Sequence, residues 1–209
     1  MRIAVLVYGR LGRGIETYEN FINHIGNEHD INFFMSSDNS NQIDFDTFIK
    51  VFKPVKYNND TIIVDDSITN KLIQSLTSYD VSVHNMIRHF INKHRVFSLL
   101  ENYMESEKVN FDLVITLRID IVFYDKINFP NIEENTIYIP EDYDFGGIND
   151  RWAYGAVSTM KKYNNIYLSM MELIERKISK VGPEALTLAN LQLHKVNIKR
   201  VETKCCIIR

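Results

Sequence analysis

The sequence predicts a single α/β domain, residues 1–209, built on a mixed, mainly parallel sheet flanked by helices. Two observations predict this class: continuous apolar runs at residues 1–8 and 111–117, and helical patterns that alternate with strand-like segments. Apolar runs of this kind are typical of parallel strands that helices cover on both faces. With 209 residues, of which 45% are hydrophobic and 24% charged, the chain is long and apolar enough for one substantial core.

The first half of the chain combines short strands with helices of increasing length. Gly26 and Pro54 follow two of the helical patterns and end them. Residues 81–107 contain neither Gly nor Pro, and their apolar residues recur at helical spacing, which predicts one long helix. The expected strands are 1–8, 30–35 and 61–64, and the expected helices are 15–25, 45–52, one beginning near 67, and 81–107.

The second half begins with the second strongly apolar strand, 111–117, which leads into residues 118–123. Pro183 stands where a helix favours proline, in its first turn. The expected strands are 111–117, 136–139 and 196–201, and the expected helices are 158–179 and one beginning at 183. A glycine turn is expected at 146–147.

Charge and cysteine content exclude several classes of function. The chain has 24 basic and 27 acidic residues and no long block of one charge, so a nucleic-acid partner is not expected. Cys205 and Cys206 are adjacent, which prevents a disulfide framework and leaves them without the spaced partners of a zinc site. Apolar stretches are too short for a signal peptide or a membrane span, so we expect a cytoplasmic protein without stable membrane insertion.

The last four residues have the outline of a prenylation motif. Arg209 is not a usual final residue of such a motif, so we expect residues 206–209 to contribute to a closing strand instead.

Arg118 and Asp120 are the candidate residues for a diphosphate and a metal ion. In an extended strand they project to the same face, directly after the buried run at 111–117. Ligands of open α/β sheets bind outside the carboxyl ends of the strands, where a guanidinium and a carboxylate can meet a diphosphate and its metal. A structural ion pair at a strand end is the alternative that the spacing leaves open.

A glycine-rich segment follows the first strand at residues 9–14. Gly9 lets the backbone approach a phosphate, and Arg10 and Arg13 add positive charge beside the helix that follows. The order G-x-x-G-x-G matches neither the dinucleotide fingerprint nor a P-loop, so a plain tight turn is the alternative.

Other carboxylates are candidates for contacts with substrate. Asp150 adjoins Trp152 after the glycine turn, and a carboxylate with an aromatic ring suits sugar hydroxyls and the apolar face of a sugar; a surface loop with one core aromatic is the alternative. Glu184 is a candidate catalytic carboxylate, although it can simply complement a helix dipole. Asp65 and Asp66 are an adjacent acidic pair, for which capping of the next helix is favoured over metal binding.

Four segments together resemble small GT-A-type glycosyltransferases of large DNA viruses (chlorella-virus-like) and of bacterial polysaccharide loci. Residues 111–123 are similar to the family's "YE…YD-hydrophobic-R-x-D" segment, and residues 9–20 to its opening "G-x-x-R…T-Y-x-N". Residues 147–155 are similar to "ND-x-F-x-Y-G", and residues 183–184 to the start of "P-E-x-x-L". The order of the four segments is the same.

The resemblance implies a GT-A-like (Rossmann-like) nucleotide-diphospho-sugar transferase fold, a UDP-sugar donor, and a glycan or glycoprotein acceptor. It also implies Mn²⁺ or Mg²⁺, retention of anomeric configuration, and a location in the host cytoplasm if the protein is viral. Enzymes of this fold often draw a metal ligand from near the C-terminus, which makes His194 a candidate. Arg118 stands where a D-x-D motif has its first Asp, and Trp152 replaces the usual Phe of the pocket segment.

Two other classes of function stay open. One is a nucleotide-sugar-binding module without catalysis, and the other is a Rossmann-like NAD(P) oxidoreductase, against which the absent dinucleotide fingerprint counts. The three histidines of the long helix, His84, His89 and His94, recur every five residues, which scatters their rings around the helix and argues against a shared metal ion.

Overall fold

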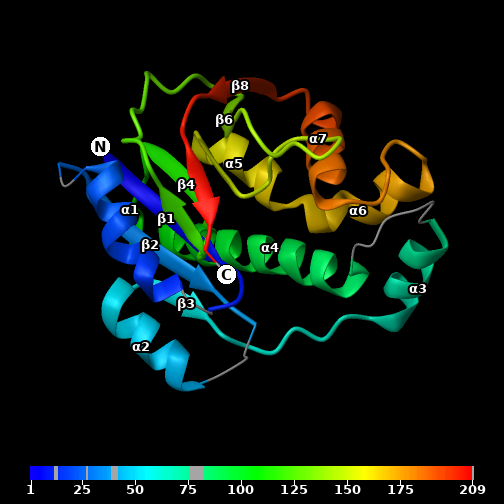
Figure 1. Ribbon diagram of the computed structural model, residues 1–209, viewed down its shortest axis with the longest axis horizontal. Helices are drawn as coiled ribbons and strands as arrows, with labels where there is room; N and C mark the ends of the chain where they lie inside the picture. Colours follow the sequence, from blue (N-terminus) through cyan, green and yellow to red (C-terminus); the bar gives the residue numbers. More distant parts are fainter. Residues whose placement is uncertain (12–13, 27, 39–41, 76–81, 209) are drawn as a thin grey trace.

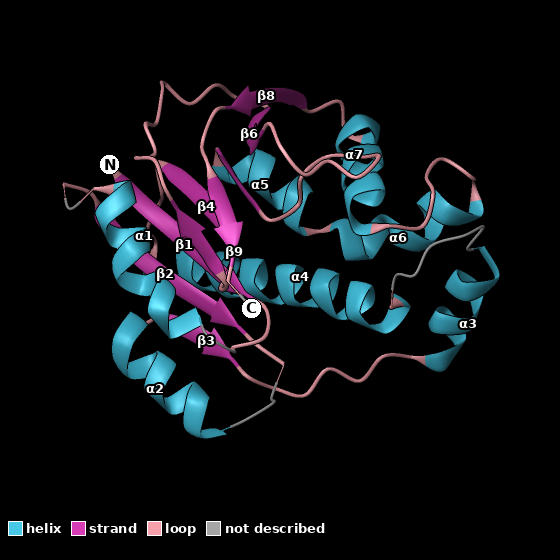
Figure 2. Ribbon diagram, viewed as in Figure 1, coloured by secondary structure: helices cyan, strands magenta, loops and turns pink. Residues whose placement is uncertain are grey.

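The computed structural model describes residues 1–11, 14–26, 28–38, 42–75 and 82–208. In these residues a seven-stranded sheet has the order β3-β2-β1-β4-β7-β6-β8 and is flanked by helices (Figure 1, Figure 2). All neighbouring strands are parallel except β7, which is antiparallel to β4 and β6. The expected mixed, mainly parallel α/β sheet is therefore confirmed.

Seven of the nine strands in the described residues belong to the main sheet. The strands of the main sheet are β1 (Arg2–Tyr8), β2 (Asp30–Ser36), β3 (Lys56–Asn58), β4 (Leu113–Arg118), β6 (Thr136–Pro140), β7 (Trp152–Gly155) and β8 (Asn197–Val201). A separate antiparallel ribbon joins β5 (Ile121–Phe123) to β9 (Cys205–Ile207). The helices are α1 (Thr17–Ile25), α2 (Gln42–Phe52), α3 (Asp66–Ser75), α4 (Val83–Glu107), α5 (Val157–Asn164), α6 (Ile166–Glu175) and α7 (Pro183–Leu193), and a 3₁₀ turn (Gly14–Glu16) precedes α1.

The alternation of side chains along β1 divides the core into two layers. Ile3, Val5 and Val7 pack with α1, α2 and the β5–β9 ribbon on one face of the sheet. Ala4 and Leu6 pack with α4 and α5 on the other face. A third cluster joins α3, α6 and α7 to the first half of α4, which Figure 2 shows beyond the end of the strands. Helices therefore cover both faces of β1, which is why its sequence is continuously apolar.

The expected strand at 61–64 is wrong, because this segment extends beside the end of β2 without joining a strand. Ile62 is buried and its backbone N–H donates to the Asp38 carboxylate at 2.9 Å, while Ile63 is 87% exposed. The strand in this region is instead β3, at Lys56–Asn58, which pairs with β2.

The expected single helix at 158–179 is interrupted at Asn165, where the chain turns between α5 and α6. The buried Asn164 donates from Nδ2 to Thr116 Oγ1 of β4 at 2.9 Å, and Asn165 Oδ1 lies 2.8 Å from His94 Nδ1 of α4. These tertiary contacts fix the turn and override the helical pattern.

Two further expectations, one for a helix cap and one for the closing strand, are confirmed. Asp65 Oδ1 accepts a hydrogen bond from Ser67 N at 2.7 Å, which is the helix-capping role favoured for the acidic pair. The tail contributes the closing strand β9. Within the described part of the chain, no helix has both the length and the apolar character needed to cross a membrane.

The contact between Gly147 and the start of α7 gives the first prediction. A Cβ at Gly147 would overlap backbone atoms of Glu184 and Ala185, which cannot move aside as a side-chain end can. We expect Gly147→Ala to lower the free energy of unfolding by about 1–3 kcal/mol, seen as a lower melting temperature.

Gly182→Ala is the matched control, because Gly182 flanks the same helix with an extended φ of 170° and no atom within 4 Å of an added Cβ. Because glycine is a better N-cap than alanine, a loss of less than about 1 kcal/mol is expected for this control. Equal effects of the two variants would contradict the close packing of the glycine turn on α7.

Candidate functional site

A cleft of about 330 Å³ lies at the carboxyl ends of β1, β2 and β4, where the first half of α4 faces them. The register explains why these ends coincide: Tyr8 at the end of β1 is level with Ser36 of β2 and with Arg118 of β4. The residues that follow each strand therefore emerge together. The cleft is lined by Tyr8, Gly9, Arg10, Asp38, Asn85, Arg88, His89, Asn92, Arg118, Ile119 and Asp120.

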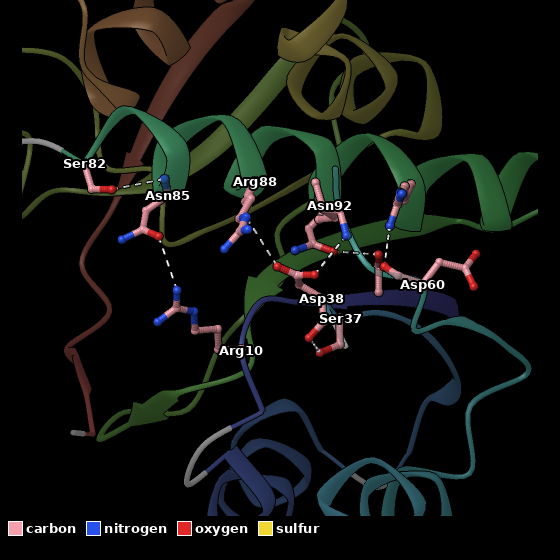
Figure 3. Close-up of polar contacts among 11 residues, drawn as sticks. Arg10, Ser37, Asp38, Asp60, Ser82, Asn85, Arg88 and Asn92 are labelled. Carbon is pink, nitrogen blue, oxygen red and sulfur yellow. Dashed lines mark hydrogen bonds and ion pairs between the residues drawn. The ribbon is translucent and has the colours of Figure 1, made fainter. Parts of the chain in front are cut away.

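One polar face of α4 forms a wall of the cleft. Asn85, Arg88, His89 and Asn92 are spaced by three and four residues, so they lie on one side of the helix. Figure 3 shows Asn85 pointing toward Arg10 and Arg88 pointing toward Asp38. None of the four was a candidate binding residue from the sequence, although their shared helical face was a readable signal.

Three guanidinium groups from three different elements surround the cleft. Arg10 Nη2 donates to Asn85 Oδ1 at 3.3 Å, and Arg88 Nε lies 3.5 Å from Asp38 Oδ2 (Figure 3). Arg118 at the end of β4 supplies the third. Three such groups beside two carboxylates favour a ligand with more than one negative charge.

Arg118 and Asp120 form a bidentate ion pair. Arg118 Nε donates to Oδ1 at 3.0 Å and Nη2 donates to Oδ2 at 2.7 Å, with the side chains 34% and 22% exposed. Burial favours a lower pKa for Arg118, but its hydrogen bonds and attraction to Asp120 outweigh burial and raise the pKa. A guanidinium has five N–H donors, so this pair leaves three for a ligand.

The pairing is the structural ion pair that the sequence left open. β4 stops at Arg118, one residue beyond the expected end at 117, and Asp120 lies in the turn before β5, so the two residues do not share one extended strand. Both side chains nevertheless line the cleft, so a role in binding remains compatible with the pair.

Asp150 is buried directly behind the cleft, with 5% of its surface exposed. His89 Nε2 lies 3.1 Å from Asp150 Oδ2, and the hydroxyls of Tyr8 and Tyr163 donate to the Asp150 carbonyl at 3.0 and 3.1 Å. Burial lowers the pKa of His89, while the charge of Asp150 and the hydrogen bond to it oppose this effect. Burial raises the pKa of Asp150, but its attraction to His89 and the hydrogen bond between them, followed by the charges of Lys93 and Arg118, keep this pKa below the ordinary value.

Lys93 is completely buried beneath this carboxylate. Its Nζ lies 3.4 Å from the centre of the Tyr163 ring and has no hydrogen-bond partner among the described residues. Burial lowers the pKa of Lys93 to about 7, against the opposing attraction of Asp150. Behind the cleft therefore lies a buried charge cluster, which combines the Asp150 carboxylate with a lysine whose pKa is near 7.

Glu184 stands in the first turn of α7, where the glycine turn meets that helix. Ile148 N donates to the Glu184 carbonyl at 3.2 Å. Burial, and then the negative charge of Asp150, raise the pKa of Glu184 to about 7, while Arg151 and Arg118 oppose the rise. The structure thus brings Glu184, Asp150 and Arg118 into one electrostatic group.

The structure does not place every predicted residue at the cleft. The Trp152 ring is completely buried, with its centre 5.2 Å from that of Phe123, so it packs in the core rather than lining a sugar pocket. His194 is at the C-terminal end of α7, three residues before β8. Because β8 runs in the same direction as β4, its first residue lies at the amino-end edge of the sheet, whereas Asp120 follows the carboxyl end of β4. His194 therefore cannot share a metal ion with Asp120. Arg13 lies outside the described residues, whereas Gly9, with φ of 120°, and Arg10 line the cleft.

The carboxylates alone do not form a closed metal site. Among residues 1–11, 14–26, 28–38, 42–75 and 82–208, no group of three His, Cys, Asp or Glu side chains is placed to hold an ion. Asp120 offers carboxylate oxygens on the cleft, and Mg²⁺-like ions commonly bind through one or two carboxylates together with substrate phosphates and water. The donor set fits a metal ion only together with a phosphate ligand.

The comparisons with known proteins identify the family and the fold. Residues 14–209 match the family described as "Domain of unknown function (DUF7796)", and the chain belongs to that family. No curated protein sequence matches the chain. A similar solved structure is the apo form of mouse xyloside xylosyltransferase 1, with 10% identity, 96% of this chain and 85% of that chain covered, and a TM-score of 0.52. This likeness confirms the GT-A-like fold that the sequence predicts.

The buried lysine gives the second prediction. In the unfolded chain Lys93 titrates near its ordinary pKa of 10.5, and in the folded protein at about 7. Below pH 7 it is charged in both states and the full cost of burying the charge is present; between pH 7 and 10.5 the unfolded state binds more protons, so stability rises with pH. Lys93→Met should therefore raise the free energy of unfolding by roughly 2–4 kcal/mol near pH 6.5, a gain that shrinks toward pH 10.

Urea unfolding of both proteins across this pH range measures the difference. If the difference in free energy of unfolding between Lys93→Met and the wild type stays constant with pH, Lys93 does not titrate near neutrality in the folded protein.

Proposed function

We propose that the protein is a glycosyltransferase that moves a sugar from a nucleotide diphosphate sugar, with UDP as the expected nucleotide, to a glycan or glycoprotein acceptor. The observation that carries the proposal is the meeting of Arg10, Arg88 and Arg118 with Asp38 and Asp120 at the carboxyl ends of parallel strands. Nucleotides bind at this edge of open α/β sheets. The fold shared with a xylosyltransferase is consistent with the proposal.

The cleft offers separate groups for each part of a nucleotide. The backbone at Gly9 allows a phosphate to approach, and the guanidinium groups can bind its oxygens in pairs. Asp38 follows the second strand, the position from which a carboxylate accepts hydrogen bonds from ribose hydroxyls in dinucleotide-binding folds. Its carboxylate is already oriented by Ile62 N and Arg88.

The reaction needs positive charge where the leaving group forms. Cleavage of the anomeric bond leaves extra negative charge on the nucleoside diphosphate, which Arg118 and its neighbours stabilise as it develops. Mn²⁺ or Mg²⁺, held by Asp120 and the diphosphate, would add Lewis-acid stabilisation to the same oxygens. Because Asp120 is paired with Arg118, binding of an ion requires that pair to open when the donor arrives.

Glu184 is the proposed acceptor-side carboxylate. A base is most effective when its pKa lies near the working pH, and the pKa of Glu184 is raised to about 7. In its ionised form it would accept the proton that the acceptor hydroxyl loses, while the buried Asp150 would position His89 and the cleft wall. An acceptor-side base is the arrangement of an inverting enzyme, whereas the family resemblance implies retention, so the configuration of the product decides between the two.

Ligand binding gives the third prediction. Melting temperatures are measured with UDP, UDP-glucose, GDP-mannose and NAD, each with and without Mn²⁺, and with Mn²⁺ alone. A ligand that binds the folded state stabilises it by mass action, so UDP compounds with Mn²⁺ should raise the melting temperature and Mn²⁺ alone should not. Arg88→Ala should weaken UDP binding at least about tenfold, because it removes a charge-assisted contact.

Arg176→Ala is the matched control, since Arg176 pairs with Glu172 of α6, is 67% exposed and does not line the cleft. Stabilisation by NAD alone would favour the oxidoreductase, and binding of UDP-sugars without transfer or hydrolysis would favour a catalytically silent binding module.

The pH dependence of activity gives the fourth prediction. Glu184 must be ionised to act as a base, and its carboxyl, with Asp150, Arg151 and Arg118 around it, titrates at about 7. kcat/KM for transfer should therefore rise with pH through about 7 and level off above about 8, and Glu184→Gln should lose this limb with about 100-fold of the activity.

Glu175→Gln, on the exposed end of α6 beside Lys71, should leave the profile unchanged. A Glu184→Gln enzyme with the wild-type pH profile would rule out Glu184 as the titrating base.

A further inference from the structure

Two aromatic side chains project from the loop between β6 and β7. Tyr143 is 46% exposed and Phe145 is 67% exposed, unusual values for such large apolar rings. Their ring centres are 6.1 Å apart and their planes differ by 31°, so the rings form one nearly continuous surface. Neither ring belongs to the buried clusters of the core.

The backbone holds both rings outward in an unfavourable conformation. Tyr143 has φ of 55° and Phe145 φ of 40°, in the left-handed region that side chains with a Cβ rarely adopt. In the described chain the other non-glycine residues with positive φ are one asparagine, which tolerates it, and four lysines that follow helices: Asn135, Lys53, Lys108, Lys177 and Lys195. Tyr143 and Phe145 are not asparagines and do not follow a helix, so neither reason accounts for their positive φ. Backbone strain of this kind commonly marks functional sites.

The loop is fixed rather than loosely attached. Buried Asn149 donates from Nδ2 to the Asp142 carbonyl at 2.7 Å, and its own N–H donates to Asp144 Oδ1 at 2.9 Å. Arg200 Nη2 of β8 donates to the same Asp144 oxygen at 2.8 Å. The aromatic surface is therefore presented in a defined position before any ligand binds.

Contacts link the aromatic surface to the proposed reaction centre. The Arg151 guanidinium lies 3.7 Å from the centre of the Tyr143 ring, and the Arg151 carbonyl accepts a hydrogen bond from Arg118 N at 3.0 Å. The loop also packs on Glu184 through Gly147. The two rings thus lie on the side of the site that Glu184 borders, and Arg118 connects that side to the cleft.

A third exposed ring and a neighbouring hollow extend this surface. Tyr124 is 63% exposed, with its hydroxyl 3.0 Å from the Cys206 thiol. It directly precedes Asp125, as Tyr143 directly follows Asp142, and these two aspartates line one hollow. A hollow of about 660 Å³ adjoins the base of the loop and includes the carboxylates of Asp125 and Asp142. Carboxylates accept hydrogen bonds from hydroxyls, and flat aromatic faces pack on the C–H faces of sugar rings.

We propose that Tyr143 and Phe145, extended by Tyr124, form the binding surface for a neutral saccharide, which is the acceptor of the transfer reaction. The role of the saccharide as acceptor rests on the proposed function, whereas saccharide binding itself is inferred from the aromatic surface alone. A neutral saccharide fits better than a charged one, since exposed rings and carboxylates together offer stacking and hydroxyl acceptors but repel anions.

Saturation-transfer difference NMR with maltose, cellobiose, lactose and xylobiose tests the proposal on the intact chain. We expect at least one disaccharide to show transfer from the wild-type protein and the signal to fall at least about fivefold in Tyr143→Ala/Phe145→Ala. Phe145→Trp, which keeps a flat ring, should retain the signal. Tyr57→Ala is the matched control, because Tyr57 is 53% exposed on the edge strand β3.

UDP-induced stabilisation, measured on the same samples, separates the two proposals. Loss of the saccharide signal with an unchanged UDP response supports the acceptor surface. Three results would overturn the acceptor surface. The first is an unchanged saccharide signal in the double variant, and the second is no signal from the wild type with any of the four disaccharides. The third is a double variant that loses the UDP response together with the saccharide signal. A wild type that binds saccharide but no nucleotide would refute the glycosyltransferase proposal and leave the saccharide surface standing.

Discussion

The site depends on the parallel register of three buried strands. Because Tyr8, Ser36 and Arg118 end β1, β2 and β4 at the same level, the chain leaves all three strands along one edge. The residues that follow, including Asp38 and Asp120, are thereby brought together although they are far apart in sequence. The apolar side chains that bury these strands on both faces hold the register, so the geometry of the polar site is set by the core.

A second constraint comes from the charges behind the cleft. Asp150 is buried against His89 and near Lys93, and two tyrosine hydroxyls bond its carbonyl. Such an arrangement stabilises the fold less than apolar packing of the same volume would. This buried charge cluster instead supports α4 rigidly. The polar face of α4 supplies one wall of the cleft, and its first half also packs on α6 and α7.

The sequence predicted the parts of the fold that depend on local pattern and missed those that depend on tertiary partners. The apolar runs and the uninterrupted pattern of α4 were enough for the mixed, mainly parallel sheet, whereas the GT-A-like class came from the family resemblance. Arg118 and Asp120 were expected together at the end of β4, and both line the cleft. The cleft residues of α4 were missed because their meaning depends on which sheet edge the helix faces. Trp152 was misplaced because β7 had not been recognised as a strand, so the side of the sheet on which its ring packs could not be read.

Release of nucleotide from UDP-sugars is the most direct test of the central claim. The purified chain is incubated with UDP-glucose, UDP-galactose or UDP-xylose and Mn²⁺, with and without disaccharide acceptors, and UDP is quantified against Asp120→Ala. The account predicts release of UDP from at least one donor, faster with an acceptor, and a loss of at least about 100-fold in the variant. If no donor is cleaved, or if Asp120→Ala releases UDP as fast as the wild type, Arg118 and Asp120 are a structural ion pair and the glycosyltransferase proposal is wrong.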